Sequence, residues 1–209
     1  MTDNKQHIEN IEEITFKDYG EKADRFWDRT KDHDVSQNYG AFLAPFEGRS
    51  DLDILDFGCG PGRDIMYFKS LGHNPVGLDG TLEFCQMARE KTQCEVLHQS
   101  FNDLELKDHS FDGIFANASM FHVPSHNLHN VLTDLWKALR PAGVLFTSNP
   151  RGDEEGWSNP GRYGNFMQLA QNKQYLDAAG FEIIDHYYRP PGLPIEEQKW
   201  LAIVAKAIK

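Results

Sequence analysis

The stretch DFGCGPGRD, residues 56–64, completes the apolar segment LDILDF and adds three glycines at alternating positions. In parallel α/β sheets, a strand that runs through such a turn into a helix binds part of a nucleoside cofactor. Gly58 lets the chain turn sharply off the strand, and Gly60 lets a ligand approach the backbone. The free N–H groups at the helix start favour an electron-rich or anionic group. The stretch therefore predicts a cofactor site after the first strand.

The spacing of the glycines separates the possible cofactors. Residues 58–62 read GxGxG, whereas a dinucleotide fingerprint reads GxGxxG, and Arg63 stands where its last glycine would fall. A P-loop would need a Lys and a hydroxyl residue that are missing here. Asp79 ends the next apolar segment, VGLD, and can accept both hydroxyls of a ribose or cap the following helix. We expect a nucleoside cofactor that is not a nicotinamide dinucleotide.

Strands and helices alternate through the rest of the chain. Apolar strand segments at 52–57, 74–79, 94–99, 111–118 and 143–149 are separated by helical segments at 64–72, 81–91 and 127–143. This order predicts a Rossmann-like α/β fold with a parallel sheet covered on both faces. Helices at 5–14, at 17–30 and from Ser36 to Pro45 predict a helical N-terminal cap. We expect one domain over 1–209, with the cap at 1–50 and the core at 51–209.

The composition restricts the partners. The chain has 209 residues with a formal net charge of −11, which disfavours nucleic acid and anionic membranes. No apolar run approaches the roughly 20 residues of a membrane span, and the N-terminus does not read as a signal peptide. The three cysteines are odd in number and form no CxxC pair, so we expect reduced thiols in a cytoplasmic protein. His122, His126 and His129 are interrupted by Pro124, and we expect no metal.

Four motifs resemble those of class I S-adenosylmethionine-dependent methyltransferases: LDFGCGPGRD at 55–64, VGLDG at 76–80, FDGIFANASMFHV at 111–123 and LWKALRPAGVLFTSN at 135–149. The resemblance runs from about Leu52 to Asn149. It implies a seven-stranded sheet whose last strand is antiparallel, with S-adenosylmethionine as cofactor and a small molecule as substrate. The residues that it assigns to the cofactor are Gly58, Cys59, Gly60, Arg63, Asp79, Gly80, Thr81, Ser100, Phe101 and Asn117.

These assignments follow the parts of the cofactor. The resemblance puts the methionine part against Gly58, Cys59 and Gly60, the ribose on Asp79, and the adenine beside Gly80 and Thr81. After the third strand, the family usually has an acidic residue near the adenine amine. This chain has Ser100 and then Phe101 there, and a neutral hydroxyl makes a weaker hydrogen bond than a carboxylate.

A narrower resemblance involves residues 19–38, 148–164 and 186–202. These segments resemble the C-terminal methyltransferase domain of the ovothiol biosynthesis enzyme. The resemblance implies a stand-alone form of that domain, which methylates an imidazole nitrogen of 5-thiohistidine. A sulfoxide synthase that makes the thiolated histidine would then be its functional partner.

Candidate residues for the acceptor lie in the same segments. Methyl transfer needs alignment more than a nucleophilic side chain. We expect His122 to accept the imidazole proton, although a loop histidine with no catalytic role is the alternative. Arginines can bind an amino-acid carboxylate, or form ordinary surface salt bridges. The expected substrate residues are Trp27, His33, Asp34, Asn38, Arg151, Arg162 and Tyr163, with Tyr187, Tyr188 or Arg189 as additions to the wall.

Other functions remain compatible with the motifs. The acceptor can be another small metabolite, a thiol or a metalloid oxyanion. The chain can also be a cofactor-binding partner subunit without turnover. Turnover of a methyl acceptor separates an enzyme from such a subunit.

Overall fold

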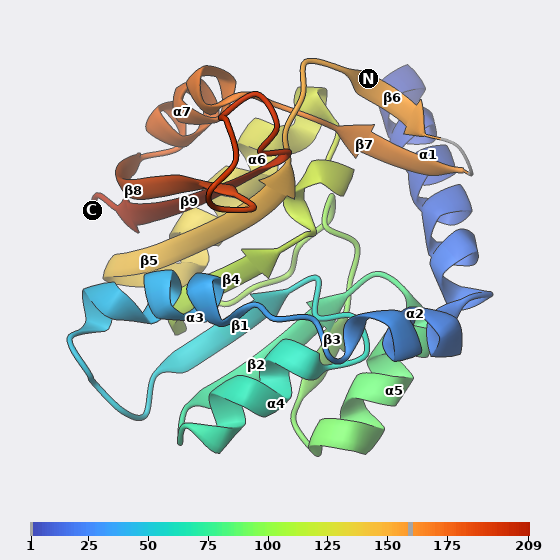
Figure 1. The fold of residues 1–209 in the computed structure, drawn as a ribbon. Coiled ribbons are helices and arrows are strands. Elements are labelled where there is room, and N and C mark those ends of the chain that lie inside the picture. Colours follow the sequence, from blue (N-terminus) through green and yellow to red (C-terminus); the bar gives the residue numbers. More distant parts are fainter. Residues whose placement is uncertain (1, 159–160) are drawn as a thin grey trace.

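The computed structural model describes residues 2–158 and 161–209. Seven strands form one sheet in the order β3-β2-β1-β4-β5-β9-β8 (Figure 1). The strands are β1 (Asp53–Phe57), β2 (Asn74–Asp79), β3 (Val96–His98), β4 (Phe111–Asn117), β5 (Leu139–Pro150), β8 (Phe181–Arg189) and β9 (Trp200–Ala207). The first five are parallel, and β9 pairs antiparallel with both β5 and β8. The predicted Rossmann-like, mostly parallel sheet is confirmed.

Helices cover both faces of the sheet (Figure 1). One face carries α3 (Ser36–Leu43), α4 (Arg63–Ser70) and α5 (Leu82–Thr92), and the other carries α6 (Ser125–Ala138) and α7 (Leu169–Ala178). Neighbouring strand residues point to opposite faces, so Phe115 packs into one core cluster while Ile114 and Ala116 pack into the other. This burial on both sides explains the continuous apolar runs of the strands.

The N-terminal segment is helical but is divided differently from the prediction. A single helix, α1 (Thr2–Gly20), replaces the expected helices at 5–14 and the start of 17–30, and α2 (Ala23–Thr30) follows it. The break falls at Gly20, whose flexibility favours a helix end. A 3₁₀ turn, η1 (Ala44–Phe46), leads into β1. Ile11 and Thr15 of α1 are only 2% and 4% exposed, so this helix is docked on the body of the protein.

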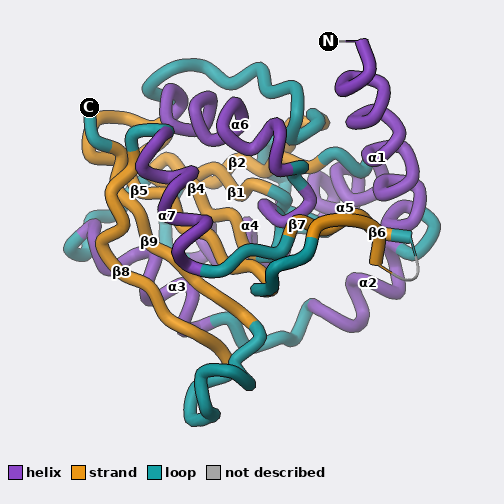
Figure 2. Tube along the Cα trace, turned by 90° about the horizontal axis from the view of Figure 1, so that it is seen from above, coloured by secondary structure: helices purple, strands orange, loops and turns teal. Residues whose placement is uncertain are grey.

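The segments on either side of β5 also differ from the sequence pattern. The helix expected over 127–143 ends at Ala138, and residues 139–143 belong to β5 because Leu139 pairs with Phe111 of β4. The long segment after β5 forms a hairpin, β6 (Glu155–Ser158) and β7 (Arg162–Asn165). Figures 1 and 2 show this hairpin beside α1, and β7 contacts that helix. None of the helices described is long and apolar enough to cross a membrane.

The carboxyl ends of three adjacent strands meet at one edge of the sheet. The glycine loop follows β1, Asp79 is the last residue of β2, and Asn117 is the last residue of β4. A short 3₁₀ turn, η2 (Met120–His122), comes directly after β4. Helices α1 and α2 stand at this edge, where open α/β sheets bind ligands.

Candidate active site

A cavity of about 720 Å³ lies between the carboxyl ends of β1, β2 and β4 and the N-terminal helices. Ligand sites typically have volumes of about 300–1,000 Å³, so the cavity has room for a nucleoside cofactor and a small acceptor. Thirteen of the residues predicted from the sequence line it: Trp27, His33, Asp34, Gly58, Cys59, Gly60, Arg63, Asp79, Thr81, Phe101, Asn117, His122 and Arg189. The other eight, Asn38, Gly80, Ser100, Arg151, Arg162, Tyr163, Tyr187 and Tyr188, are not among its lining residues.

The glycine loop is fixed to the neighbouring strand. The N–H groups of Gly58 and Cys59 donate to the Leu78 carbonyl at 2.8 and 3.0 Å. Gly58 has φ of +83°, and a Cβ there would lie 2.3 Å from Cβ of Ser119, so only glycine fits. Burial raises the pKa of the Cys59 thiol well above its ordinary value. That thiol is therefore neutral and suits packing better than reactivity.

Asp79 is held as a preformed acceptor at the end of β2. Its two carboxylate oxygens accept the N–H groups of Gly60 at 3.0 Å and of Thr81 at 2.8 Å. Burial nevertheless raises the pKa of Asp79 to about 6. Each oxygen keeps a second lone-pair direction for a ligand. A diol that bound there would donate to a carboxylate already oriented by the backbone.

Of the residues expected beside the adenine, some line the cavity and others are covered by α1. Phe101 lines the cavity. Gly80 does not, because the Phe16 ring lies 2.2 Å from the point where a Cβ would stand. Ser100 is also set back, since its hydroxyl donates to the carboxylate of Glu12 from α1. Phe16 and Glu12 themselves line the cavity, so α1 forms the surface expected from residues 80 and 100.

His122 is neutral and has a defined tautomer. Its Nδ1 lies 2.8 Å from the Tyr163 carbonyl, which can only accept, so Nδ1 carries the proton. Its Nε2 lies 2.9 Å from the Tyr19 hydroxyl and accepts a hydrogen bond from it. Burial lowers the pKa of His122 to about 4. Tyr163 contacts His122 through its backbone carbonyl, whereas its side-chain hydroxyl donates to Glu155 at 2.6 Å.

The two arginines expected to bind an acceptor carboxylate are engaged outside the cavity. The Arg162 guanidinium lies 4.0 Å from the centre of the Tyr19 ring and donates to Asp18 at 2.7 Å. The Arg151 guanidinium lies 4.7 Å from the centre of the Tyr188 ring and donates to a backbone carbonyl. Their placement does not agree with direct contact to an acceptor in this cavity. The resemblance and the ability of arginine to bind a carboxylate suggested both residues. The structure instead places Arg162, at the start of β7, on Tyr19, and Arg151, directly after β5, on Tyr188.

Arg189, at the end of β8, reaches the cavity instead. It donates to Oδ1 of Asn38 at 3.0 Å and to the Asp34 carbonyl at 3.3 Å. Asn38 is fully buried and also bonds Asn117 at 2.9 Å and the Tyr187 hydroxyl at 2.8 Å. Asn38 is thus a support for the wall. Among the described residues no carboxylate lies within 4 Å of the Arg189 guanidinium, so its charge is available to a ligand.

Arg63 differs from Arg189 because its charge is already paired. Its Nε and Nη2 donate to Asp64 at 2.7 and 2.9 Å, and Nη1 donates to the Thr30 carbonyl at 3.1 Å. The Tyr39 hydroxyl donates to the same carboxylate at 2.5 Å. This network fixes α2 and α3 against the glycine loop.

Helix α2 and the connection from α2 to α3 contribute residues to the cavity wall. Trp27, His33 and Asp34 line the cavity. Asp34 also accepts the N–H of Ser36 at 2.9 Å, and this hydrogen bonding lowers the pKa of its carboxyl. Asp34 is therefore a turn acceptor at the start of α3 as well as a wall residue.

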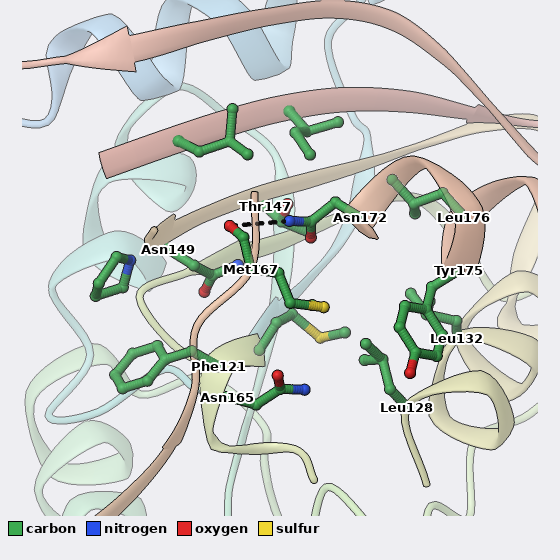
Figure 3. A pocket seen from close by; sticks show the side chains of 14 residues that line it. Phe121, Leu128, Leu132, Thr147, Asn149, Asn165, Met167, Asn172, Tyr175 and Leu176 are labelled. Atoms are coloured by element: carbon green, nitrogen blue, oxygen red, sulfur yellow. Dashed lines mark hydrogen bonds between the residues drawn. The ribbon is translucent and has the colours of Figure 1, made fainter. Parts of the chain in front are cut away.

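A second cavity lies beside β5, α6 and α7 (Figure 3). Its volume of about 20 Å³ is enough for about one water molecule. The Asn172 amide, near its apolar wall, donates to the Met167 carbonyl at 3.5 Å. This space is too small for a cofactor. Within residues 2–158 and 161–209, no cluster of three or more His, Cys, Asp or Glu side chains has a metal-binding arrangement.

Comparison with known proteins identifies relatives of the segment that forms the carboxyl-end edge of the sheet. Residues 54–143 match the family described as "Methyltransferase domain". This range, which is less than half of the chain, is similar to a class I S-adenosylmethionine-dependent methyltransferase domain. The matched range includes the glycine loop, Asp79 and His122. The predicted methyltransferase assignment and its cofactor, S-adenosylmethionine, are confirmed at this level.

Relatives of the methyltransferase domain act on varied acceptors, as their names state. The malonyl-[acyl-carrier protein] O-methyltransferase of Salmonella typhimurium is 32% identical over 116 residues, which is 54% of this chain and 45% of that protein. A sterol 24-C-methyltransferase of Neurospora crassa is 23% identical over 159 residues, 66% of this chain and 41% of that protein. The chain spans about half the length of the curated relatives it matches.

A solved structure has the same fold over most of this chain. The 1,6-didemethyltoxoflavin-N1-methyltransferase of Burkholderia thailandensis, solved with its acceptor and S-adenosylhomocysteine, superposes with a TM-score of 0.74. The two chains are 20% identical, and the match covers 93% of this chain and 87% of that one. The likeness establishes the shared fold.

Proposed function

We propose that this protein transfers a methyl group from S-adenosylmethionine to a small-molecule acceptor, and that the acceptor is an imidazole nitrogen of 5-thiohistidine. One observation carries the proposal. One cavity is lined both by the glycine loop with Asp79 and by Tyr19, His122 and Arg189. The first group suits the cofactor, and the second suits an acceptor that has a proton to lose and a carboxylate to bind.

S-adenosylmethionine, when bound, supplies a methyl carbon on a sulfonium sulfur that a nucleophile displaces in line. The residues of this chain then have to orient the acceptor and exclude water, which can lower the barrier by about 7–11 kcal/mol. As the unprotonated imidazole nitrogen of the acceptor forms its bond to carbon and the carbon–sulfur bond breaks, the ring becomes cationic and its other nitrogen loses a proton. The Tyr19 oxygen takes that proton while the Tyr19 proton moves to Nε2 of His122.

Three features favour an acceptor of the 5-thiohistidine type. Two of the three residues, Tyr19 and Arg189, come from segments 19–38 and 186–202, in which the sequence predicts a resemblance to the ovothiol enzyme. The Arg189 guanidinium is the group that suits the acceptor carboxylate, because it lines the cavity and is oriented by Asn38. The solved 1,6-didemethyltoxoflavin-N1-methyltransferase, which has a similar fold, is named for N1-methylation, and this agrees with transfer to a nitrogen atom. A sulfoxide synthase would supply the thiolated histidine.

The test is a product assay with S-adenosylmethionine labelled in its methyl group. Purified protein is incubated separately with 5-thiohistidine, histidine, a small thiol and arsenite, and labelled products are identified by mass spectrometry. We expect a singly methylated 5-thiohistidine with the label on the ring. The Asp79→Ala variant serves as the control for cofactor-dependent turnover.

Each other outcome has a defined meaning. Turnover of the thiol or of arsenite, without methylated 5-thiohistidine, would overturn the acceptor and keep the transferase. Binding of S-adenosylmethionine without turnover of any compound would favour a partner subunit that has no activity of its own.

A further inference from the structure

Glu12 of α1 brings a carboxylate to the part of the cavity beyond Asp79. Its Oε1 accepts hydrogen bonds from the Ser100 hydroxyl and from the Asn102 amide, the latter at 2.7 Å. The Asn102 amide cannot turn round, because its own oxygen accepts from Asn127 at 2.9 Å. Three side chains from the loop after β3 and from α6 thus hold the Glu12 carboxylate in place.

Thr15 lies one helical turn after Glu12 and also lines the cavity. It is only 4% exposed, and its Oγ1 has no hydrogen-bond partner among the residues that the structure describes. Leaving a buried hydroxyl unpaired is unfavourable, so this atom is suited to a partner that arrives with a ligand. The face of α1 therefore carries a fixed acceptor and, one turn away, a buried hydroxyl without a hydrogen-bond partner among the described residues.

We infer that Glu12 and Thr15 form the site that recognises the adenine base of the cofactor. This inference rests on the proposed function and assigns residues of that same cavity. If the glycine loop holds the methionine part and Asp79 the ribose, the base extends to the side of Asp79 where Phe101, Asn102 and Glu12 lie. Glu12 accepts the exocyclic amine, and the Thr15 hydroxyl donates to an adjacent ring nitrogen.

The pairing of donor and acceptor makes this site selective for a 6-aminopurine. A 6-oxopurine presents a carbonyl oxygen where adenine has its amine, and this oxygen would face the Glu12 carboxylate. It also presents an N–H beside that oxygen in place of the acceptor nitrogen. The Glu12 carboxylate on α1 thereby supplies the charged acceptor for the adenine amine, which the neutral Ser100 hydroxyl does not provide.

The experiment measures binding of S-adenosylhomocysteine and of S-inosylhomocysteine by calorimetry, so no methyl acceptor is needed. The variants are Glu12→Gln and Thr15→Val, and Glu13→Gln is the matched control because Glu13 is exposed on the same helix. We expect the wild type to prefer the adenosyl compound by about 10-fold or more. Glu12→Gln should bring the ratio of dissociation constants close to one, since its amide can donate to the inosine oxygen. Glu13→Gln should keep the wild-type ratio.

Thr15→Val separates recognition from a structural role. Removing an unpaired buried hydroxyl should leave the thermal stability of the ligand-free protein unchanged or higher. The same variant should bind S-adenosylhomocysteine about 3- to 10-fold more weakly. A wild-type ratio retained in Glu12→Gln, together with unchanged affinity in Thr15→Val, would overturn the inference. Failure of the wild type to bind either compound would instead overturn the proposed function.

Discussion

The Tyr19 hydroxyl lies 2.9 Å from Nε2 of His122, although 103 positions separate the two residues in the chain. The bond from Nδ1 of His122 to the Tyr163 carbonyl, at 2.8 Å, leaves Nε2 without a proton. Tyr19 is therefore the donor, and the pair is arranged to pass a proton from Tyr19 toward the imidazole. Arg162, stacked 4.0 Å from the Tyr19 ring centre, fixes that ring from its other side.

His122→Asn should lower kcat while affinity for S-adenosylhomocysteine stays nearly unchanged. The shorter asparagine amide can keep the donor to the Tyr163 carbonyl but cannot present an acceptor to Tyr19. A pKa of about 4 makes His122 a weak base at neutral pH, so we expect a loss of about 10²-fold, at the lower end for such catalysis. Single-turnover rates on 5-thiohistidine check this. Tyr19→Phe should show a loss of similar size, and full activity in either variant would contradict the proton transfer.

Affinity for S-adenosylhomocysteine should rise with pH through about 6. The Asp79 pKa is raised to about 6 in the ligand-free protein, so the carboxyl is neutral below that pH and ionised above it. Ribose hydroxyls donate more strongly to the ionised form. We expect affinity about 10-fold weaker at pH 5 than at pH 7. Calorimetry across this range tests it, and Asp79→Asn should remove the dependence; an identical slope in that variant would assign the titration to another group.

Asp79→Ala should weaken cofactor binding at neutral pH. The variant loses hydrogen bonds to a charged acceptor, which cost about 1.5–3 kcal/mol, or roughly 10- to 150-fold in affinity. It also frees the N–H groups of Gly60 and Thr81 that the carboxylate holds. Calorimetry on a variant whose circular dichroism matches the wild type gives the answer. Unchanged affinity would exclude Asp79 from the ribose site.

Arg189→Gln should raise KM for 5-thiohistidine and leave the dissociation constant of S-adenosylhomocysteine unchanged. Loss of a buried charge pair costs about 2–5 kcal/mol. Because Arg189 is partly exposed, we expect a smaller effect, a rise in KM of about 10- to 100-fold. Arg151→Gln is the control, since Arg151 lies outside the cavity lining. The decarboxylated acceptor, 5-thiohistamine, should be insensitive to Arg189→Gln. An equal rise in KM for both acceptors would show that Arg189 does not bind the carboxylate.

Gly58→Ala should destabilise the protein more than Gly48→Ala. Both glycines have positive φ, +83° and +77°, but only Gly58 faces a neighbour, with Ser119 at 2.3 Å from the added Cβ. The shared backbone strain costs about 1–2 kcal/mol, and the clash adds about 1–3 kcal/mol at Gly58 alone. Urea unfolding of both variants measures the difference. Equal losses would mean that Ser119 moves aside freely.

The cofactor half of the cavity could be predicted from the sequence because its residues lie close to the strands that carry them. Gly58, Gly60 and Asp79 each follow a recognisable apolar strand, and parallel strands bring their carboxyl ends to one edge. The position of His122 after β4 follows from the same rule. In these cases local pattern and global fold agree, so no long-range information is required.

The acceptor half could not be predicted in this way. Arg162 and Arg189 both stand in segments that looked suitable, yet the β6–β7 hairpin stacks Arg162 on Tyr19 while β8 brings Arg189 to the cavity. Glu12 and Thr15 gave no signal, because their helical spacing is that of any docked helix. Which face of a helix meets a ligand depends on packing against distant elements.

By itself the sequence determined the alternating α/β order, the glycine loop and the acid at the end of β2, since these depend on periodicity and backbone freedom over a few residues. Only the tertiary structure decided that α1 lies over the cavity, that Tyr19 meets His122, and that Glu12 meets Ser100 and Asn102. Such contacts join residues about 90 to 100 positions apart, and their energy comes from burial and hydrogen bonding that no local pattern records.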